Sequence, residues 1–343
     1  MEANRLQEII CRFPKCRVTV LGDFFLDKYL DVDPAIAEVS LETGKTAHQV
    51  VSTRCSPGAA GTVVNNLAAL GTGTLHVVGI TGDDGEGFEL RQALQNLGCD
   101  TQGLQILPNR FTPTYLKPRN CRTADLSGEH ERYDTKNRQP TSIEVQENAL
   151  VSLESLLPHT DAVIVLDQVE EDECGIVTAK VRKSLADLAD RNPRKIFWAD
   201  SRRRIGLFRN VIIKPNVHEA VKEIFPGSTG VPCDEIVEKA ITELRKRTGR
   251  PVFVTAGRRG IWISDSIPSL IRGVRVDEPT DPTGAGDSAT AGAVLALCAG
   301  ASLQEAALIA NLVASLTVQQ LATTGTASPD QLGPRLEVWR SQG

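Results

Sequence analysis

The run Thr283-Gly284-Ala285-Gly286-Asp287 places small residues and a carboxylate directly before a segment rich in Ala and Leu, which we expect to be a helix. Small residues let a ligand approach the backbone, and the first N–H groups of a helix attract an anion. A carboxylate held there can accept a proton from a hydroxyl group. Phosphoryl transfer to an alcohol requires an anion cradle beside a general base, so the run predicts that chemistry.

The same run also has a structural interpretation, a glycine turn followed by an Asp helix cap, and alone it does not choose between the two. Other segments favour the catalytic interpretation. Asp23 and Asp27 follow a short apolar strand, where open α/β sheets bind ligands, and their carboxylates can bind the hydroxyls of a polyol. The small-residue loop 56–61 leads into a helix with Asn65 and Asn66. This loop either contacts a substrate or allows the helix to pack closely against a strand.

A further group of residues suits a nucleotide and a metal ion. In Lys214-Pro215-Asn216-Val217-His218-Glu219, which follows a strand and opens a helix, Asn216 and Glu219 have the spacing of a capping box. The same two side chains can hold Mg²⁺ through water, so both interpretations stay open. Thr255 and Gly257 follow another strand, where they either contact nucleotide phosphates or only form the turn.

Two other nucleotide-binding patterns fail. Thr43-Gly44-Lys45-Thr46 is similar to the end of a Walker A loop, but Val39 stands where its first glycine is expected. We expect that segment to belong to an accessory β structure. No GxGxxG run follows the first strand, which disfavours a dinucleotide-dependent oxidoreductase.

The elements that must position these residues alternate between strands and helices, which predicts a parallel sheet with helices on both faces. Segments 24–37, 45–54, 114–118 and 131–134 are instead extended and are interleaved with one another rather than with helices. We expect one α/β domain spanning residues 1–343, with a small β lid built from about 24–54 and 111–134. Strands are expected at 17–22, 75–80, 162–167, 195–200, 211–214, 251–255 and 260–264, and helices at 65–70, 87–97, 142–157, 177–191, 217–225, 234–248, 286–298 and 303–321, the last two closing the chain.

The composition is that of a soluble globular protein, with 41% hydrophobic and 24% charged residues. Aromatic residues make up only 4%, so the core must consist of Val, Ile, Leu and Ala, which suits buried parallel strands. The net charge of −5, and basic runs without interleaved aromatics, give no reason to expect a nucleic-acid partner. No segment approaches the ~18 apolar residues of a membrane span.

The eight cysteines form no CxxC pair and are scattered along the chain. With no apparent signal peptide, this pattern indicates reduced thiols rather than a zinc site or a disulfide framework. We therefore expect a cytoplasmic protein.

In their order along the chain, these motifs resemble the PfkB (ribokinase-like) carbohydrate kinases. The resemblance covers roughly residues 15–328, and its most specific motif is Asp281–Asp287. It implies a ribokinase-like α/β fold, with a central, mostly parallel sheet, helices on both faces and a β-sheet lid. Segments 39–42, 132–134 and 200–202 are most similar to the D-glycero-D-manno-heptose 7-phosphate kinase branch, the kinase half of ADP-heptose synthesis enzymes.

The resemblance implies an ATP-dependent kinase that uses Mg²⁺ and a sugar or sugar phosphate as acceptor. In this family's pattern Asp287 is the catalytic base, and Gly284, Ala285 and Gly286 form the anion hole. The sugar is expected at Asp23, Gly58 and Asn66, with Asp27 beside them. The nucleotide and Mg²⁺ are expected at Asn216, Glu219, Thr255 and Gly257, with Asn311 and the Gly325-Thr326 turn flanking the adenine.

The acceptor stays open. Ala59 and Thr62 replace a glycine and an Asn of the family pattern, segment 42–45 lacks an Ala-Pro pair, and Ser288-Ala289 follows the base. Arg132, with Lys117 and Arg119, either holds a substrate phosphate or is surface charge. A nucleoside kinase of the same fold and a non-catalytic sugar or nucleotide sensor remain alternatives. The oligomeric state is also open, although the resemblance implies pairing of lids in a homodimer.

Overall fold

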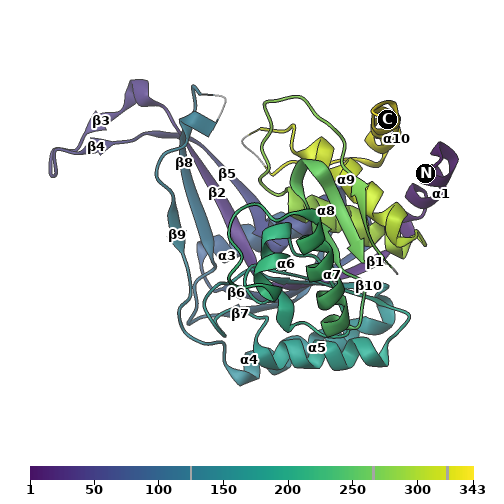
Figure 1. The fold of residues 1–343 in the computed structure, drawn as a ribbon. Coiled ribbons are helices and arrows are strands. Elements are labelled where there is room, and N and C mark those ends of the chain that lie inside the picture. Colours follow the sequence, from purple (N-terminus) through teal and green to yellow (C-terminus); the bar gives the residue numbers. More distant parts are fainter. Residues whose placement is uncertain (124–125, 265–266, 322–323) are drawn as a thin grey trace.

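The computed structural model describes residues 1–123, 126–264, 267–321 and 324–343. Its central layer is a parallel sheet of six strands in the order β12-β11-β10-β1-β6-β7, as the alternation of strands and helices predicts (Figure 1). The strands are β1 (Arg17–Gly22), β6 (Thr74–Gly82), β7 (Asp100–Leu107), β10 (Ala162–Asp167), β11 (Ile196–Ser201) and β12 (Ile212–Ile213).

Strand β10 shows why this sheet is buried on both faces. Ala162, Ile164 and Leu166 belong to one hydrophobic core, whereas Val163 and Val165 belong to the other. All five side chains are fully buried. An uninterrupted apolar strand is what a sheet covered by helices on both sides requires.

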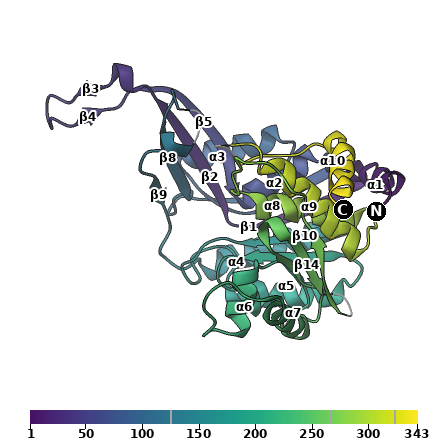
Figure 2. The ribbon, with the colours of Figure 1, turned by 45° about the horizontal axis from the view of Figure 1, so that its top comes forward.

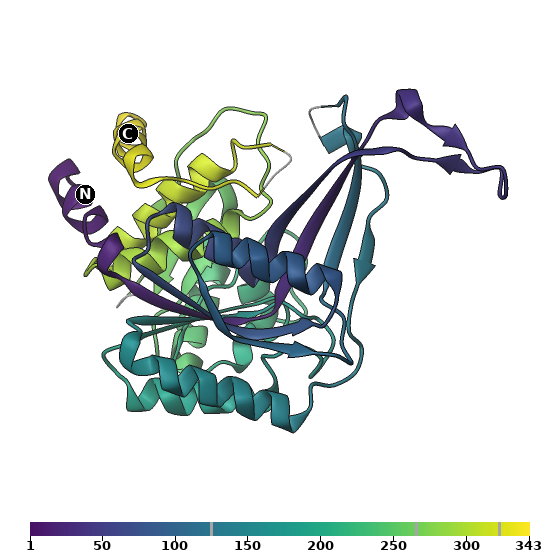
Figure 3. The same cartoon turned by 180° about the vertical axis from the view of Figure 1, so that it is seen from behind.

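Helices cover both faces of the sheet, and Figures 1 and 3 show α4 and α5 on one side and α8 and α9 on the other. Among the described residues, no helix has the length and apolar character needed to cross a membrane. The first core includes α1 (Ala3–Ile10), α2 (Ala60–Ala69), α3 (Gly85–Asn96), α8 (Ala285–Cys298), α9 (Leu303–Thr317) and α10 (Pro329–Ser341), and the second includes α4 (Ile143–Leu156), α5 (Ala179–Arg191), α6 (Val217–Ile224) and α7 (Asp234–Thr248).

A second, mixed sheet, called the lid sheet below, has the strand order β5-β2-β8-β9. Its strands lie in or next to the segments expected for a lid. A hairpin of β3 (Glu38–Val39) and β4 (Thr46–Ala47) projects from it, well away from the helices (Figure 2). The Walker-like segment 43–46 lies in this hairpin. The four strands are β2 (Phe24–Val32), β5 (Val50–Ala59), β8 (Thr114–Asn120) and β9 (Tyr133–Thr135).

A third sheet extends the edge of the central one beyond β12. It is antiparallel and contains β13 (Phe253–Thr255), β14 (Gly260–Ser264) and β15 (Pro268–Arg272). Isolated parallel bridges join Ile213 to Val252 and Asn216 to Thr255. The second bridge places two predicted nucleotide-binding residues side by side.

Several element boundaries differ from the sequence prediction. The helix expected at 65–70 begins at Ala60, and the one expected to end at Leu321 ends at Thr317. The chain does not close with that helix, because α10 follows it. Pro334 lies inside α10, and a proline there argues against a helix when only the sequence is read. The sequence analysis also missed α1, β7 and β15.

Candidate active site

The glycine-rich run forms a turn that ends at the N-terminus of α8. Gly284 is the N-cap and has φ +76°, a left-handed conformation that favours glycine. The Asp281 carboxylate accepts a hydrogen bond of 2.9 Å from the N–H of Thr283, which fixes the turn. The N–H of Ala285 donates to the carbonyl of Pro282. Among the described residues, Gly286 and Asp287 therefore keep backbone N–H groups for an anion at this helix end.

Asp287 lies in the first turn of α8 and is mostly enclosed. Burial and then the neighbouring Asp200 raise the pKa of Asp287 to about 7, against the attraction of Lys214 and Arg202. Asp27 of the lid sheet raises it further. Its carboxylate therefore titrates near neutral pH, which suits a group that must gain and lose a proton.

Lys214 is the cation at the centre of this cluster. Its side chain is 6% exposed, and Nζ lies 2.7 Å from Oδ2 of Asp200. A Cβ on Gly286 would lie 3.4 Å from the same Nζ, so the ammonium group borders the helix end. Burial works to lower the pKa of Lys214, but Asp200, Asp287 and Glu219 hold it above its ordinary value. The ammonium group therefore stays charged.

Asn216 and Glu219 form the capping box that their spacing predicts. The Asn216 side chain accepts the N–H of Glu219 at 2.9 Å, and Oε2 of Glu219 accepts the N–H of Asn216 at 2.8 Å. Burial raises the pKa of Glu219, and Asp200 raises it further. In the part of the chain that the structure describes, no group of three or more His, Cys, Asp or Glu residues is arranged to hold a metal ion.

One pocket adjoins the start of α8 on the side of β13–β15. Thr255, Gly257, Gly286 and Asn311, all expected at the nucleotide or the phosphoryl group, line it together. Nδ2 of Asn311 also donates to the carbonyls of Ile271 and Arg272, so this side chain holds β15 in place. Gly325 does not line the pocket, and its backbone packs against the carbonyl of Thr317.

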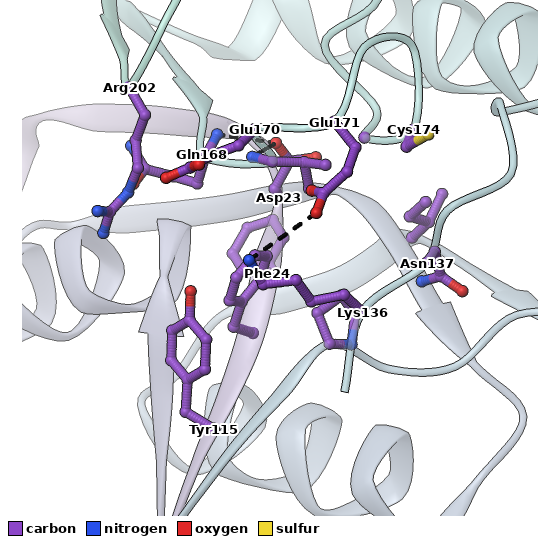
Figure 4. Close-up of a pocket in the computed structure, with 15 residues that line it drawn as sticks. Asp23, Phe24, Tyr115, Lys136, Asn137, Gln168, Glu170, Glu171, Cys174 and Arg202 are labelled. Atoms are coloured by element: carbon purple, nitrogen blue, oxygen red, sulfur yellow. Dashed lines mark hydrogen bonds and ion pairs between the residues drawn. The ribbon is translucent and has the colours of Figure 1, made fainter. Parts of the chain in front are cut away.

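A second pocket lies where the lid sheet meets the carboxyl ends of β1 and β10. Asp23 borders it and is 3% exposed (Figure 4). Its carboxylate accepts backbone hydrogen bonds of 2.8 to 3.0 Å from Gln168, Val169 and Ile176. Burial raises the pKa of Asp23 to about 6, despite these three N–H groups. In this conformation Asp23 anchors the loop that follows β10.

The other residues expected at the sugar are divided between the lid sheet and α2. Asp27 lies 3.0 Å from Nζ of Lys117, and a Cβ on Gly58 would lie 2.9 Å from the Asp27 carboxylate. Arg132 pairs with Asp134 and stacks over the Tyr115 ring at 4.2 Å. Asn66 is fully buried within α2, where its Nδ2 donates to Thr62.

Arg202 connects the two halves of the site, although the sequence analysis did not assign it a role. It borders the second pocket opposite Lys136 and Asn137 (Figure 4), and its Nε donates to Gln168 at 3.0 Å. Its charge also acts on Asp287. Among the described residues no carboxylate pairs with Arg202. The sequence offered one signal for a role of Arg202, namely its place in the run 200–202 at the end of β11.

A helix end with free N–H groups, a carboxylate in its first turn and a pocket beside it is an arrangement that suits phosphoryl transfer to an alcohol. Comparison with known proteins agrees. The model of the "pfkB family carbohydrate kinase" matches residues 27–331, so the chain belongs to this family and is a carbohydrate kinase.

Among curated proteins, the chain is 28% identical to "Bifunctional protein HldE" of Desulfatibacillum aliphaticivorans, over 96% of this chain and 65% of that protein. It is 30% identical to the protein of the same name from Shewanella sp., over 96% of this chain and 70% of that one. The chain thus spans about two thirds of the length of these relatives. They fit the branch that the sequence resembles.

Solved structures confirm the fold. Arabidopsis thaliana ribokinase, described as complexed with ribose and ATP, matches with a TM-score of 0.68 at 17% identity, over 94% of this chain and 99% of that one. Thermotoga maritima ribokinase matches with a TM-score of 0.65 at 17% identity, over the same shares of the two chains.

Proposed function

We propose that the protein transfers the γ-phosphoryl group of ATP to a hydroxyl of a phosphorylated sugar. The observation that carries this proposal is the position of Asp287 and Lys214 at the N-terminus of α8, beside the pocket that Gly286 lines. The pocket that is lined by Thr255, Gly257 and Asn311 binds the nucleotide. The pocket under the lid sheet takes the sugar.

In this mechanism Asp287 accepts the proton of the attacking hydroxyl. The hydroxyl oxygen forms a bond to the γ-phosphorus, the bond from that phosphorus to the bridging oxygen breaks, and ADP leaves. A pKa near 7 leaves a substantial share of Asp287 ionised at neutral pH. An ordinary carboxylate suffices, since phosphoryl transfer depends more on positioning and charge neutralisation than on strong basicity.

The negative charge on the transferring group is stabilised from two sides. The N–H groups at the start of α8 donate to its oxygens, and Lys214 supplies a fixed positive charge at the same place. Because Lys214 is buried and paired with Asp200, it is held in position before the substrates bind.

A magnesium ion fits the nucleotide side of the site. Oε2 of Glu219 accepts the Asn216 N–H, which leaves Oε1 for a water molecule of the ion. Water-mediated contact with one or two carboxylates is the usual way in which proteins hold Mg²⁺. Glu219, with Asn216, would hold the ion, which neutralises phosphate charge when it is bound.

An arginine at the edge of the acceptor pocket supports a sugar phosphate. Arg202 borders it without a carboxylate partner among the described residues, and Arg132 lies over Tyr115 nearby. A phosphorylated heptose is the first candidate, because the sequence resembles the heptose phosphate kinases. The proposal extends to a cytoplasmic homodimer that pairs through the lid, where Val39 and Leu41 of the projecting hairpin are exposed.

A panel of acceptors tests this function. The purified protein is incubated with Mg²⁺-ATP and heptose 7-phosphates, hexose phosphates, free sugars or nucleosides, and products are identified by mass spectrometry. We expect the highest kcat/KM with a phosphorylated sugar. Preferred turnover of a nucleoside would refute the acceptor class, and ligand binding without any phosphorylated product would establish the sensor alternative.

Analytical ultracentrifugation of the protein and of a Leu41→Glu variant tests the dimer.

A further inference from the structure

The pocket proposed for the nucleotide has one cation and one anion in its lining. Among the described residues that border it, Arg258 is the only positively charged side chain and Glu278 is the only negatively charged one. The other residues are uncharged, and several of them, such as Ile261, Val274 and Val318, are apolar. A nucleotide brings several negative charges into this lining, so Arg258 is the charged group that the pocket offers to its phosphates.

The two charged residues belong to different segments of the pocket wall. Arg258 lies in the short helical turn 257–259 after β13, whereas Glu278 lies in the segment between β15 and α8 that also brings Pro282 to the pocket. Nη2 of Arg258 is paired with Oε1 of Glu278. The two side chains are 71% and 66% exposed, so the ion pair lies at the mouth of the pocket.

The backbone around Arg258 is fixed, although its side chain is exposed. The N–H of Ala256 donates to the carbonyl of Gly260 at 2.8 Å, and the N–H of Gly273 donates to the carbonyl of Arg259 at 3.0 Å. These bonds close the turn and hold it beside the end of β15. The guanidinium group has further N–H donors beyond the one that contacts Glu278, and they form a planar fork that fits two phosphate oxygens.

We propose that Arg258 binds the phosphate groups that stay on the nucleotide, and that Glu278 is the partner it gives up for them. This inference rests on the proposed nucleotide pocket and adds a specificity-determining residue to it. Without a nucleotide, Glu278 neutralises Arg258 in an exposed ion pair, which is weak. When a nucleotide enters, its phosphate oxygens replace the carboxylate, because arginine binds phosphate through two parallel N–H bonds.

Arg258 and Lys214 then serve different parts of ATP. Lys214 is buried, paired with Asp200, and adjoins Gly286 at the start of α8, where the transferring group is expected. It is not among the described residues that line the nucleotide pocket. Loss of Arg258 should therefore raise KM for ATP and weaken ADP equally, whereas loss of Lys214 should act mainly on kcat.

Isothermal titration calorimetry with ADP, ATP and adenosine tests this exchange without any acceptor. Arg258→Gln should raise the Kd for ADP and ATP about tenfold, the effect of losing one hydrogen bond to a charged group, and leave the Kd for adenosine unchanged. Glu278→Gln should instead lower the Kd for ADP and ATP severalfold, since it removes a competing partner and a negative charge beside the phosphates.

Arg259→Gln is the matched control. Arg259 is the next residue of the same turn and pairs with Asp234 at 2.7 Å, but it is not among the described residues that line the pocket, so the Kd for ADP should not change. Arg258→Lys should bind ADP with an affinity between those of the unmodified protein and Arg258→Gln, because lysine keeps the charge without the planar fork. All four variants change exposed side chains, and circular dichroism should confirm that each is folded.

Three results would overturn the inference. An unchanged Kd for ADP in Arg258→Gln would show that the guanidinium group does not contact phosphate. Weaker ADP binding in Glu278→Gln, or an equal loss of adenosine affinity in Arg258→Gln, would show that the ion pair only holds the pocket wall. No ADP binding by the unmodified protein would be a different failure, since it would refute the proposed nucleotide pocket itself and the inference with it.

Discussion

Replacing Asp287 with Asn should reduce activity and increase stability at the same time. The variant keeps the shape of the side chain but cannot accept a proton, so we expect kcat to fall by about 10²–10⁴-fold. In the unmodified enzyme kcat/KM should fall as the pH drops through about 7, because Asp287 becomes protonated. The residual activity of the Asn variant should lose this dependence.

The gain in stability follows from the raised pKa of Asp287. The folded protein keeps a proton on this carboxylate up to about pH 7, whereas the unfolded chain loses it near 3.8. The unfolded state therefore binds fewer protons between these values, and stability falls as the pH rises through this window. At pH 8 the ionised Asp287 costs up to about 4 kcal/mol, since one pKa unit corresponds to 1.36 kcal/mol. Asn removes this cost, less the lost attraction to Lys214.

Urea unfolding at pH 5 and pH 8, followed by circular dichroism, measures this difference. The Asn variant should be more stable than the unmodified protein at pH 8, with a smaller difference at pH 5. Asp330→Asn is a matched control, because Asp330 also lies in the first turn of a helix but is exposed. Near-normal kcat in Asp287→Asn would refute the assignment of the base, and lower stability at pH 8 would refute the electrostatic argument.

Three other substitutions test the remaining parts of the site. Lys214→Met should lower kcat by about 10²–10³-fold, which is the effect of removing one donor that stabilises charge in the transition state. Steady-state assays with saturating sugar measure this change. Arg202→Gln should raise KM for a phosphorylated acceptor at least tenfold, about the 1.4 kcal/mol of a weakened charge-assisted hydrogen bond, and leave KM for ATP unchanged. Gly284→Ala should lower the free energy of unfolding by about 1 kcal/mol in urea titrations, because the φ of +76° strains an L-residue. A Cβ at this position would not clash, since its nearest neighbours, Thr62 and Thr324, lie at ordinary contact distance.

Residues that act within one segment were predictable from the sequence. The turn at Gly284, the helix after it and the capping box of Asn216 and Glu219 depend on neighbours only a few positions away. The parallel sheet was predictable because uninterrupted apolar strands alternate with amphipathic helices. Helix α10 was missed because it contains Pro334. The rule that excludes proline from helices considers only the local backbone, whereas the packing of α10 against the core outweighs that local cost.

Contacts between distant segments were not predictable. Lys214 belongs to a run that the sequence analysis singled out, but its partner Asp200 lies on a neighbouring strand. Asp23 was placed correctly at the end of β1, yet nothing in its surroundings showed that N–H groups of residues 168–176 would occupy its carboxylate. Such contacts depend on strand order and register, which no local pattern specifies.

The three carboxylates around Lys214 differ in what else holds them, and this difference favours Asp287 as the proposed base. Asp200 is fixed by the ammonium group at 2.7 Å, and Glu219 is fixed by the N–H of Asn216. Asp287, in contrast, accepts no hydrogen bond from any residue that the structure describes. A proton from the substrate therefore displaces no existing partner at Asp287, whereas at the other two it would compete with one. Asp200 and Glu219 also keep Lys214 charged, and Asp200 raises the pKa of Asp287. Fixed charges thus tune the one carboxylate that is free to react.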